Sequence, residues 1–228
     1  MGLPNNLDPA SVAAAVVEGV QQGAAETGVR VNLIGIISRT YGAETGIKEL
    51  EALLTQKEAI NALDLAGDEA NFPGELFVEH FKRGRDAGWH ITVHAGEAAG
   101  ADSVWQAIQG LGAVRIGHAV RIQEDPALID YMLEHQIGIE ANLTSNVQTS
   151  TVPDLACHPL KGWLDRGLLA TINTDDPAIS NIDLPHEYNI AAPAAGLTAD
   201  QIHQAQRNAL HIAFLPQDEK ETLQASKS

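Results

Sequence analysis

The chain has 228 residues, 44% hydrophobic and 19% charged, which is a composition typical of a globular protein with one large core. Thirty acidic and 14 basic residues give a formal net charge of −16, which argues against nucleic-acid and anionic-membrane partners because both require clustered lysine and arginine. The single cysteine, Cys157, excludes an internal disulfide framework and a cysteine-rich zinc site.

Helical and apolar segments alternate along the chain. The first helix is expected from about Pro9 to Glu26, with Asp8 as its N-cap. Buried strands are predicted at residues 31–37, 60–65, 90–94, 114–118, 137–141 and 168–173. Helical periodicity covers residues 44–54, 75–87, 101–111, 126–135 and 159–166. Thr198 and Gln201 form a capping-box pattern that begins a last helix, which extends to about Ala213.

Polar residues mark the end of every predicted strand. Strand starts recur every 23 to 31 residues, the length of one βα unit, and no linker divides the chain, so we expect one domain over residues 1–228. In a (β/α)8 barrel the carboxyl ends of all strands meet at one face, which carries the active site. An open doubly wound sheet would concentrate polar groups at one switch point. Six polar ends out of six favour an α/β fold of the (β/α)8 TIM-barrel type.

Nothing near Met1 resembles a signal peptide, and no apolar run is long enough to span a bilayer. We therefore expect a cytoplasmic protein that binds a small neutral or cationic molecule, with neither nucleic acid nor membrane as a partner.

The run from His94 to Glu97 places a candidate metal ligand and a candidate proton donor three residues apart, just after an apolar stretch. Imidazole nitrogen binds divalent metals, and a nearby carboxylate can pass a proton to or from a substrate. Gly96, between them, lets backbone approach a ligand closely. The alternative is a buried histidine and an exposed glutamate in an ordinary turn.

Asp175 and Asp176 close another strand, directly before Pro177. Adjacent aspartates are costly to desolvate unless a positive group or a hydrogen-bond donor receives them, as a metal at Asp175 and a donor at Asp176 would. With the histidine–glutamate run they suggest a metal-assisted hydrolase, although the 228 residues contain no His-x-His, which such a site normally needs. An Asx-turn or helix cap is the alternative.

Other candidates are weaker. His118 ends an otherwise apolar strand and is either a satisfied core residue or part of the site. Gly67 could donate its backbone N–H to a ligand or belong to an ordinary loop. His90 begins its strand and should lie at the opposite face, and His158 is expected to have a structural role. The run 144–149 is predicted to be a polar loop without assigned chemistry.

The motifs ISRTYG, LDLAGDE, HITVHAGE, RIGHA, LTSNVQTS and INTDDP, in this order, closely resemble adenosine deaminase of the bacterial type, in the amidohydrolase group. The similarity runs through essentially the whole chain, and HAGE with TDDP at this separation is its most specific part. The resemblance implies a zinc-dependent (β/α)8 barrel that acts in purine nucleotide metabolism.

The resemblance also implies a zinc site and its acid–base groups. His94 and Asp175 match two Zn²⁺ ligands of the family, and Glu97 matches the proton donor to purine N1. His118 matches the histidine that orients the zinc-bound water and helps to deprotonate it.

Two substrate contacts follow in the same way: Asp176 matches the aspartate that contacts purine N7, and Gly67 matches the backbone donor to N3. The implied reaction is hydrolytic deamination, in which a zinc-activated water attacks C6 of adenosine or 2′-deoxyadenosine and ammonia leaves, giving inosine or 2′-deoxyinosine.

The chain departs from the family pattern in two ways. Ala119 stands where the family usually has glycine, and we expect the added methyl to be tolerated. The family's first two strands and their His-x-His are absent, so the expected fold is an incomplete barrel with about six of eight strands. Two protein ligands are too few for a zinc site, so we expect this polypeptide alone to hold zinc weakly and to be inactive. Its open barrel edges favour self-association.

The departures leave several interpretations open. The start codon could be misplaced, the chain could be a fragment that needs a partner chain, or it could be a non-catalytic remnant that acts as a binding module. Within enzymes, deamination of adenine or another aminopurine is the alternative. Nucleotide substrates are disfavoured, because the loops at 144–154 and 175–186 contain no lysine or arginine to hold a phosphate.

Overall fold

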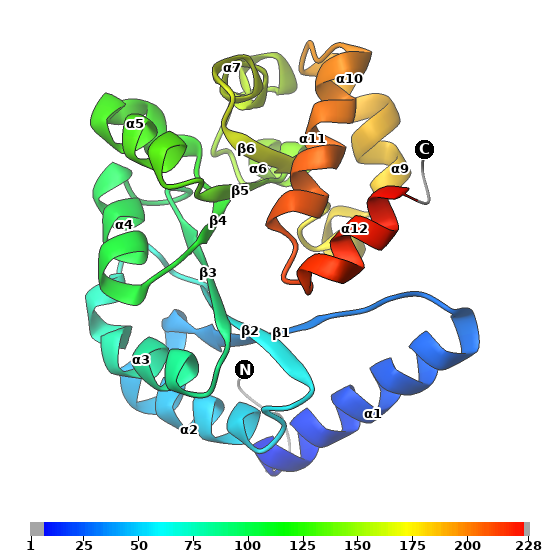
Figure 1. Ribbon diagram of the computed structural model, residues 1–228. Coiled ribbons are helices and arrows are strands. Elements are labelled where there is room, and N and C mark those ends of the chain that lie inside the picture. The colour runs from blue at the N-terminus through cyan, green and yellow to red at the C-terminus, as the bar shows by residue number, and fades with distance from the viewer. Residues whose placement is uncertain (1–6, 226–228) are drawn as a thin grey trace. The chain divides into compact units, whose positions relative to one another are not determined.

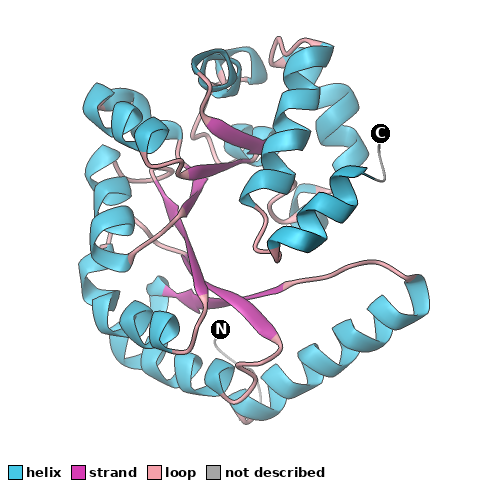
Figure 2. Ribbon diagram, viewed as in Figure 1, coloured by secondary structure: helices cyan, strands magenta, loops and turns pink. Residues whose placement is uncertain are grey.

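Two units make up the described part of the chain, residues 7–225, in the computed structural model. Unit 1 extends to His94 and includes Trp105–Ala113, and unit 2 consists of Ala95–Val104 and the residues from Val114 onward. In both units strands alternate with helices, as Figure 2 shows in magenta and cyan. The prediction of a single domain over residues 1–228 stays a prediction.

Unit 1 contains three neighbouring parallel strands, in the order of the chain (Figure 1). Its main elements are α1 (Pro9–Thr27), β1 (Leu33–Ser38), α2 (Gly42–Leu54), β2 (Ile60–Ala66), α3 (Val78–Asp86) and β3 (His90–Ala95), with the short helices η2 (Arg39–Tyr41), η3 (Gly74–Phe77) and η4 (Gln106–Leu111). Asp8 caps α1 by accepting a hydrogen bond from the N–H of Ser11, as the sequence predicts.

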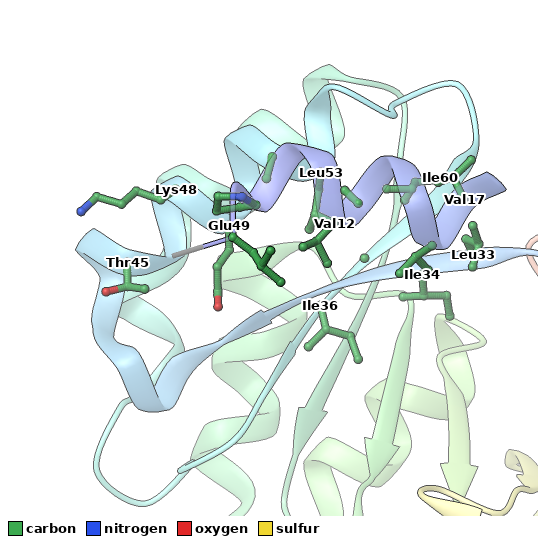
Figure 3. A pocket seen from close by; sticks show the side chains of 16 residues that line it. Val12, Val17, Leu33, Ile34, Ile36, Thr45, Lys48, Glu49, Leu53 and Ile60 are labelled. Carbon is green, nitrogen blue, oxygen red and sulfur yellow. The ribbon is translucent and has the colours of Figure 1, made fainter. Parts of the chain in front are cut away.

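One face of β1 packs closely on α2, and a cavity remains where α1 lies next to these two elements. Ile37 is fully buried, and a side chain at Gly35 would collide with Leu53 of α2. On the other face of the strand, Ile34 and Ile36 are 37% and 47% exposed. An apolar cavity of about 360 Å³ lies among α1, β1 and α2, lined by residues that include Val12, Val17, Leu33 and Leu53 (Figure 3).

Unit 2 also contains three neighbouring parallel strands, with Ile116 of β4 paired to Ile139 of β5, which pairs with Ala170 of β6. These strands are β4 (Arg115–His118), β5 (Gly138–Ala141) and β6 (Leu169–Ile172). The first helices of the unit are α4 (Ala101–Trp105, whose last residue belongs to unit 1), η5 (Val120–Glu124), α5 (Pro126–Glu134), α6 (Leu143–Gln148), η6 (Leu155–Cys157) and α7 (Leu160–Arg166). After β6 come α8 (Pro177–Ser180), α9 (Leu184–His186), η7 (Glu187–Ala191), α10 (Ala192–Ala194), α11 (Ala199–Ile212) and α12 (Gln217–Ala225).

The predicted strands are confirmed to within two residues at each end, and so is the capping box of Thr198 and Gln201 at the start of α11. The prediction of a loop at 144–149 is wrong, because α6 occupies Leu143–Gln148. Threonine, serine and asparagine are poor helix formers, and the helix forms because tertiary hydrogen bonds hold its side chains.

Two other helices differ in detail from the prediction. The segment 75–87 begins with the 3₁₀ turn η3 before α3, and the segment 101–111 changes from α4 to the π-helical turn η4. Between residues 7 and 225, no helix is both long and apolar enough to cross a membrane.

Candidate active site

His118 is the centre of a polar cluster in unit 2. It ends β4, is 1% exposed, and directs its Nε2 atom toward two carboxylates. Oε2 of Glu97 lies 3.5 Å from this nitrogen, and Oδ2 of Asp175 lies 3.9 Å from it. The sequence placed these three residues at separate strand ends, and the fold brings them together around one imidazole nitrogen.

The position of Glu97 depends on the turn before it. The N–H of Ala119 donates to the carbonyl of Ala95, and the N–H of Arg121 donates to that of Gly96, so the turn is fixed to the segment that follows β4. Gly96 has a φ of 72°, and a Cβ there would lie 2.8 Å from a methyl group of Val104. The turn therefore requires glycine.

Oε1 of Glu97 accepts a hydrogen bond from the Thr149 hydroxyl at 3.2 Å. The Glu97 side chain is 25% exposed, so the exposed position of the alternative is not observed, while the role of Glu97 stays a prediction.

Asp175 is held from α6. Its Oδ2 atom accepts a hydrogen bond from the Ser145 hydroxyl at 2.6 Å. Asp176 is exposed and occupies the N-cap position of α8, before Pro177, yet its side chain makes no capping hydrogen bond. The helix-cap interpretation therefore accounts for the backbone of Asp176 and leaves its carboxylate available for another contact.

Two asparagines hold the other side of His118. The side-chain nitrogen of Asn146 lies 2.9 Å from Nδ1 of His118, and that of Asn142 lies 3.3 Å from the same atom. Asn146 is completely buried on α6, and its Oδ1 lies 3.2 Å from Nε2 of His158. The sequence alone assigns no chemistry to Ser145 and Asn146. The only available signal was their place directly after a strand.

His158 is 4% exposed, as the prediction of a structural role requires. Its Nδ1 atom accepts a hydrogen bond from the N–H of Leu160 at the start of α7. Burial, together with the neighbouring His118, lowers the pKa of His158 from 6.5 to about 4, so this ring is neutral at pH 7.

The backbone is strained at two of the residues in this cluster. His118 and Asp175 have φ values of 67° and 57°, in the left-handed region, and Ala119 follows with 57°. Such conformations cost of order 1–3 kcal/mol each and persist where surrounding contacts enforce them. Ala119 is fully buried, so the residue that departs from the family's usual glycine takes up a backbone conformation that favours glycine.

His94 ends unit 1, on β3, one residue before the start of unit 2. Oδ2 of Asp64, a buried residue of β2, lies 2.9 Å from Nδ1 of His94. The buried guanidinium of Arg39 donates to the carbonyl of His94 at 2.6 Å and to that of Leu65 at 3.4 Å. A carboxylate beside one ring nitrogen is typical of metal-binding histidines.

Gly67 follows β2 in unit 1 with a φ of 106°, and a Cβ at this position would lie 2.5 Å from the hydroxyl oxygen of Thr40. That hydroxyl accepts a hydrogen bond from the N–H of Asp68. The position therefore requires glycine for close packing and backbone conformation.

The donor set suits a zinc ion. Unit 2 by itself brings one imidazole nitrogen and two carboxylates together. Zn²⁺ prefers nitrogen and carboxylate ligands of this kind. A carboxylate such as Glu97 beside an imidazole can also exchange protons with a bound molecule.

A family model described as adenosine deaminase matches residues 2–226 of the chain. The adenosine deaminase of Salmonella schwarzengrund is 59% identical over 223 residues, which are 98% of this chain and 67% of that protein. The adenosine deaminase of Edwardsiella ictaluri is 61% identical over 216 residues, or 95% of this chain and 65% of that protein. The chain thus spans about two thirds of the length of these relatives.

Solved structures with the same fold include an adenine deaminase from Arthrobacter aurescens, with a TM-score of 0.86 at 25% identity, covering 91% of this chain and 64% of that one. An amidohydrolase from Burkholderia ambifaria with bound Zn has a TM-score of 0.86 at 24% identity, covering 96% and 62%. These matches confirm the predicted fold class, an α/β barrel of the TIM type that this chain represents in part.

Proposed function

Because this chain belongs to the adenosine deaminase family, we propose that its cluster around His118 serves the hydrolytic deamination of adenosine or 2′-deoxyadenosine to inosine or 2′-deoxyinosine. The observation that carries the proposal is the placement of Nε2 of His118 3.5 Å from Glu97 and 3.9 Å from Asp175. One nitrogen between two carboxylates offers metal binding and proton transfer at the same point.

We propose His94 and Asp175 as the protein ligands for Zn²⁺ within this chain. Asp64 supports the ring of His94, and Ser145 supports the carboxylate of Asp175, so both ligands have the kind of hydrogen-bonding or charged partner that orients a metal ligand. When bound, zinc would make water nucleophilic near neutral pH.

The remaining residues act on the substrate in this proposal. Glu97 donates a proton to purine N1, and the Thr149 hydroxyl holds the carboxylate in place for this step. His118 orients the attacking water. The exposed side chain of Asp176 contacts N7, and the backbone N–H of Gly67 donates a hydrogen bond to N3.

A nucleoside suits the sequence better than the alternatives. Identity of 59–61% to two adenosine deaminases outweighs 25% identity to an adenine deaminase. The segments 144–154 and 175–186 lack lysine and arginine, so they offer no cation for a nucleotide phosphate. A cytoplasmic location and the lack of nucleic-acid and membrane partners remain predictions.

We expect the 228-residue polypeptide by itself to show no measurable turnover, because only His94 and Asp175 match zinc ligands of the family, whereas zinc sites use three or four protein ligands. Self-association is part of the same proposal, since Ile34 and Ile36 of β1 expose apolar surface.

The experiment that tests this function supplies the missing ligands. The chain is co-expressed with the part of the Salmonella relative that it does not match, and we call the product the complemented protein. Its deamination of adenosine, 2′-deoxyadenosine, adenine and AMP is measured as the release of ammonia. We expect the two nucleosides to be deaminated fastest.

Glu97→Gln should lower the rate by a factor of at least about 100, since general acid catalysis contributes about that much. Glu124→Gln is the matched control, because Glu124 pairs with Arg121 on the surface. A complemented protein that deaminates none of the four compounds, or one that is indifferent to Glu97→Gln, would overturn the proposal.

A further inference from the structure

A chain of hydrogen bonds leads from a backbone N–H of α7 to the site. It begins at the N–H of Leu160, which donates to Nδ1 of His158 over 3.1 Å. Since a backbone N–H can only donate, this nitrogen of His158 must carry a lone pair. The neutral ring then has its hydrogen on Nε2, which lies 3.2 Å from Oδ1 of Asn146.

The orientation of the Asn146 amide follows from this first step. Oδ1 of Asn146 accepts the hydrogen of His158, so the amide must present its NH₂ group to the other neighbour. That neighbour is Nδ1 of His118, 2.9 Å away. A hydrogen on this atom would face a second N–H at close range, so Nδ1 of His118 accepts.

We infer that His158, acting through Asn146, is a positioning residue that fixes the hydrogen of neutral His118 on Nε2. All three side chains are buried, with 4%, 0% and 1% exposure for His158, Asn146 and His118, so water does not compete for these hydrogen bonds. Asn142 reaches the same nitrogen of His118 at 3.3 Å but makes no hydrogen bond to His158 among the described residues, so it accommodates the tautomer of His118 without determining it.

The hydrogen on Nε2 determines what His118 can do. This nitrogen faces Glu97 and Asp175, and in this tautomer it donates a hydrogen bond toward them or toward a bound oxygen. It cannot at the same time accept a proton from water. His118 therefore orients the water, and the proton goes to a carboxylate. This consequence, unlike the tautomer itself, rests on the proposed function.

The test reads the tautomer directly. In the 228-residue chain labelled with ¹⁵N-histidine, long-range ¹H–¹⁵N correlation spectra at pH 7.5 distinguish a hydrogen on Nδ1 from one on Nε2. Signals are assigned through the backbone, so that no site residue needs to be changed. We expect the Nε2–H pattern for both His158 and His118. An Nδ1–H pattern or a mixture of tautomers at His118 would overturn the inference.

Two matched substitutions test the pathway. Asn146→Leu and Asn142→Leu each replace a buried amide with a side chain of similar size next to the same nitrogen. Asn146→Leu should convert the single tautomer of His118 into a mixture, and Asn142→Leu should leave it unchanged. The opposite result would transfer the role to Asn142 and overturn the assignment to His158. If Asn146→Leu does not fold, the spectrum of the unaltered chain still decides.

The outcome separates this inference from the proposed function. Deamination by the complemented protein together with an Nδ1–H tautomer of His118 would overturn the positioning role of His158 and support the proposed function. An Nε2–H tautomer without deamination would support the positioning role of His158 and overturn the proposed function.

Discussion

The hydroxyl of Ser145 donates a hydrogen bond of 2.6 Å to Oδ2 of Asp175 and so links α6 to the segment that follows β6 in unit 2. Asp175 has a left-handed backbone conformation, and Ser145 is 5% exposed, so the partner of this carboxylate is fixed before any ligand arrives.

Ser145→Ala should weaken zinc binding by about 10- to 100-fold, because partners of metal ligands have effects of this size. The measurement is a zinc titration of the complemented protein against a competing chelator. Ser180→Ala is the control, since Ser180 is also buried in unit 2 and its side chain is not among the contacts of Asp175 in the described residues. Equal affinities for the Ser145→Ala variant and the unaltered protein would refute this role.

Gly96→Ala should destabilise the chain by about 2–4 kcal/mol, combining a left-handed conformation with a collision against Val104. Gly162→Ala is the matched control, because Gly162 lies in α7 and nothing outside the helix backbone lies within 4 Å of an added Cβ, so alanine there should stabilise by about 1 kcal/mol. Urea unfolding followed by circular dichroism measures both changes. A Gly96→Ala variant as stable as the parent would show that the turn before Glu97 is not fixed.

The stability of the chain should depend on pH through His158. Its pKa is about 4 in the folded protein and 6.5 in the unfolded chain, so only the unfolded chain takes up a proton between these values. The contribution is therefore fully present above pH 6.5, and it is lost as the pH falls toward 4. The 2.5-unit difference corresponds to about 3 kcal/mol.

His158→Gln should flatten this part of the pH profile, measured by urea unfolding at several pH values. His203→Gln, at an exposed histidine of α11, is the control and should leave the profile as it was. An unchanged slope in the His158→Gln variant would mean that another group causes the dependence.

Self-association should depend on the exposed face of β1. Ile36 is 47% exposed there, and Ile36→Lys should raise the monomer fraction in sedimentation velocity, since a charge opposes burial in an apolar contact. Ile190→Lys, at a residue 59% exposed in unit 2, is the control. A chain that is already monomeric at all concentrations would contradict the expected association.

Periodicity made the strands and their polar ends predictable, because buried parallel strands are continuous apolar runs whose limits are marked by polar residues. Glu97, His118 and Asp175 could be predicted for this reason. Ser145 and Asn146 could not, since residues with low helix propensity gave no sign of α6.

The left-handed conformations of His118 and Asp175 could not be predicted from the sequence either, because neither position is a glycine. Tertiary contacts impose them. The hydrogen-bonded connection between His158 and His118 could not be predicted from the sequence, because it passes through Asn146 and depends on which ring nitrogen of His158 accepts from the N–H of Leu160.

The zinc content per polypeptide, determined by elemental analysis after dialysis, tests the central claim most directly. We expect about one ion in the complemented protein and far less than one in the 228-residue chain alone. Asp175→Asn should lose the ion, and Asp130→Asn, at an exposed aspartate of α5, should keep it. One tightly held zinc ion in the complemented Asp175→Asn variant would contradict it.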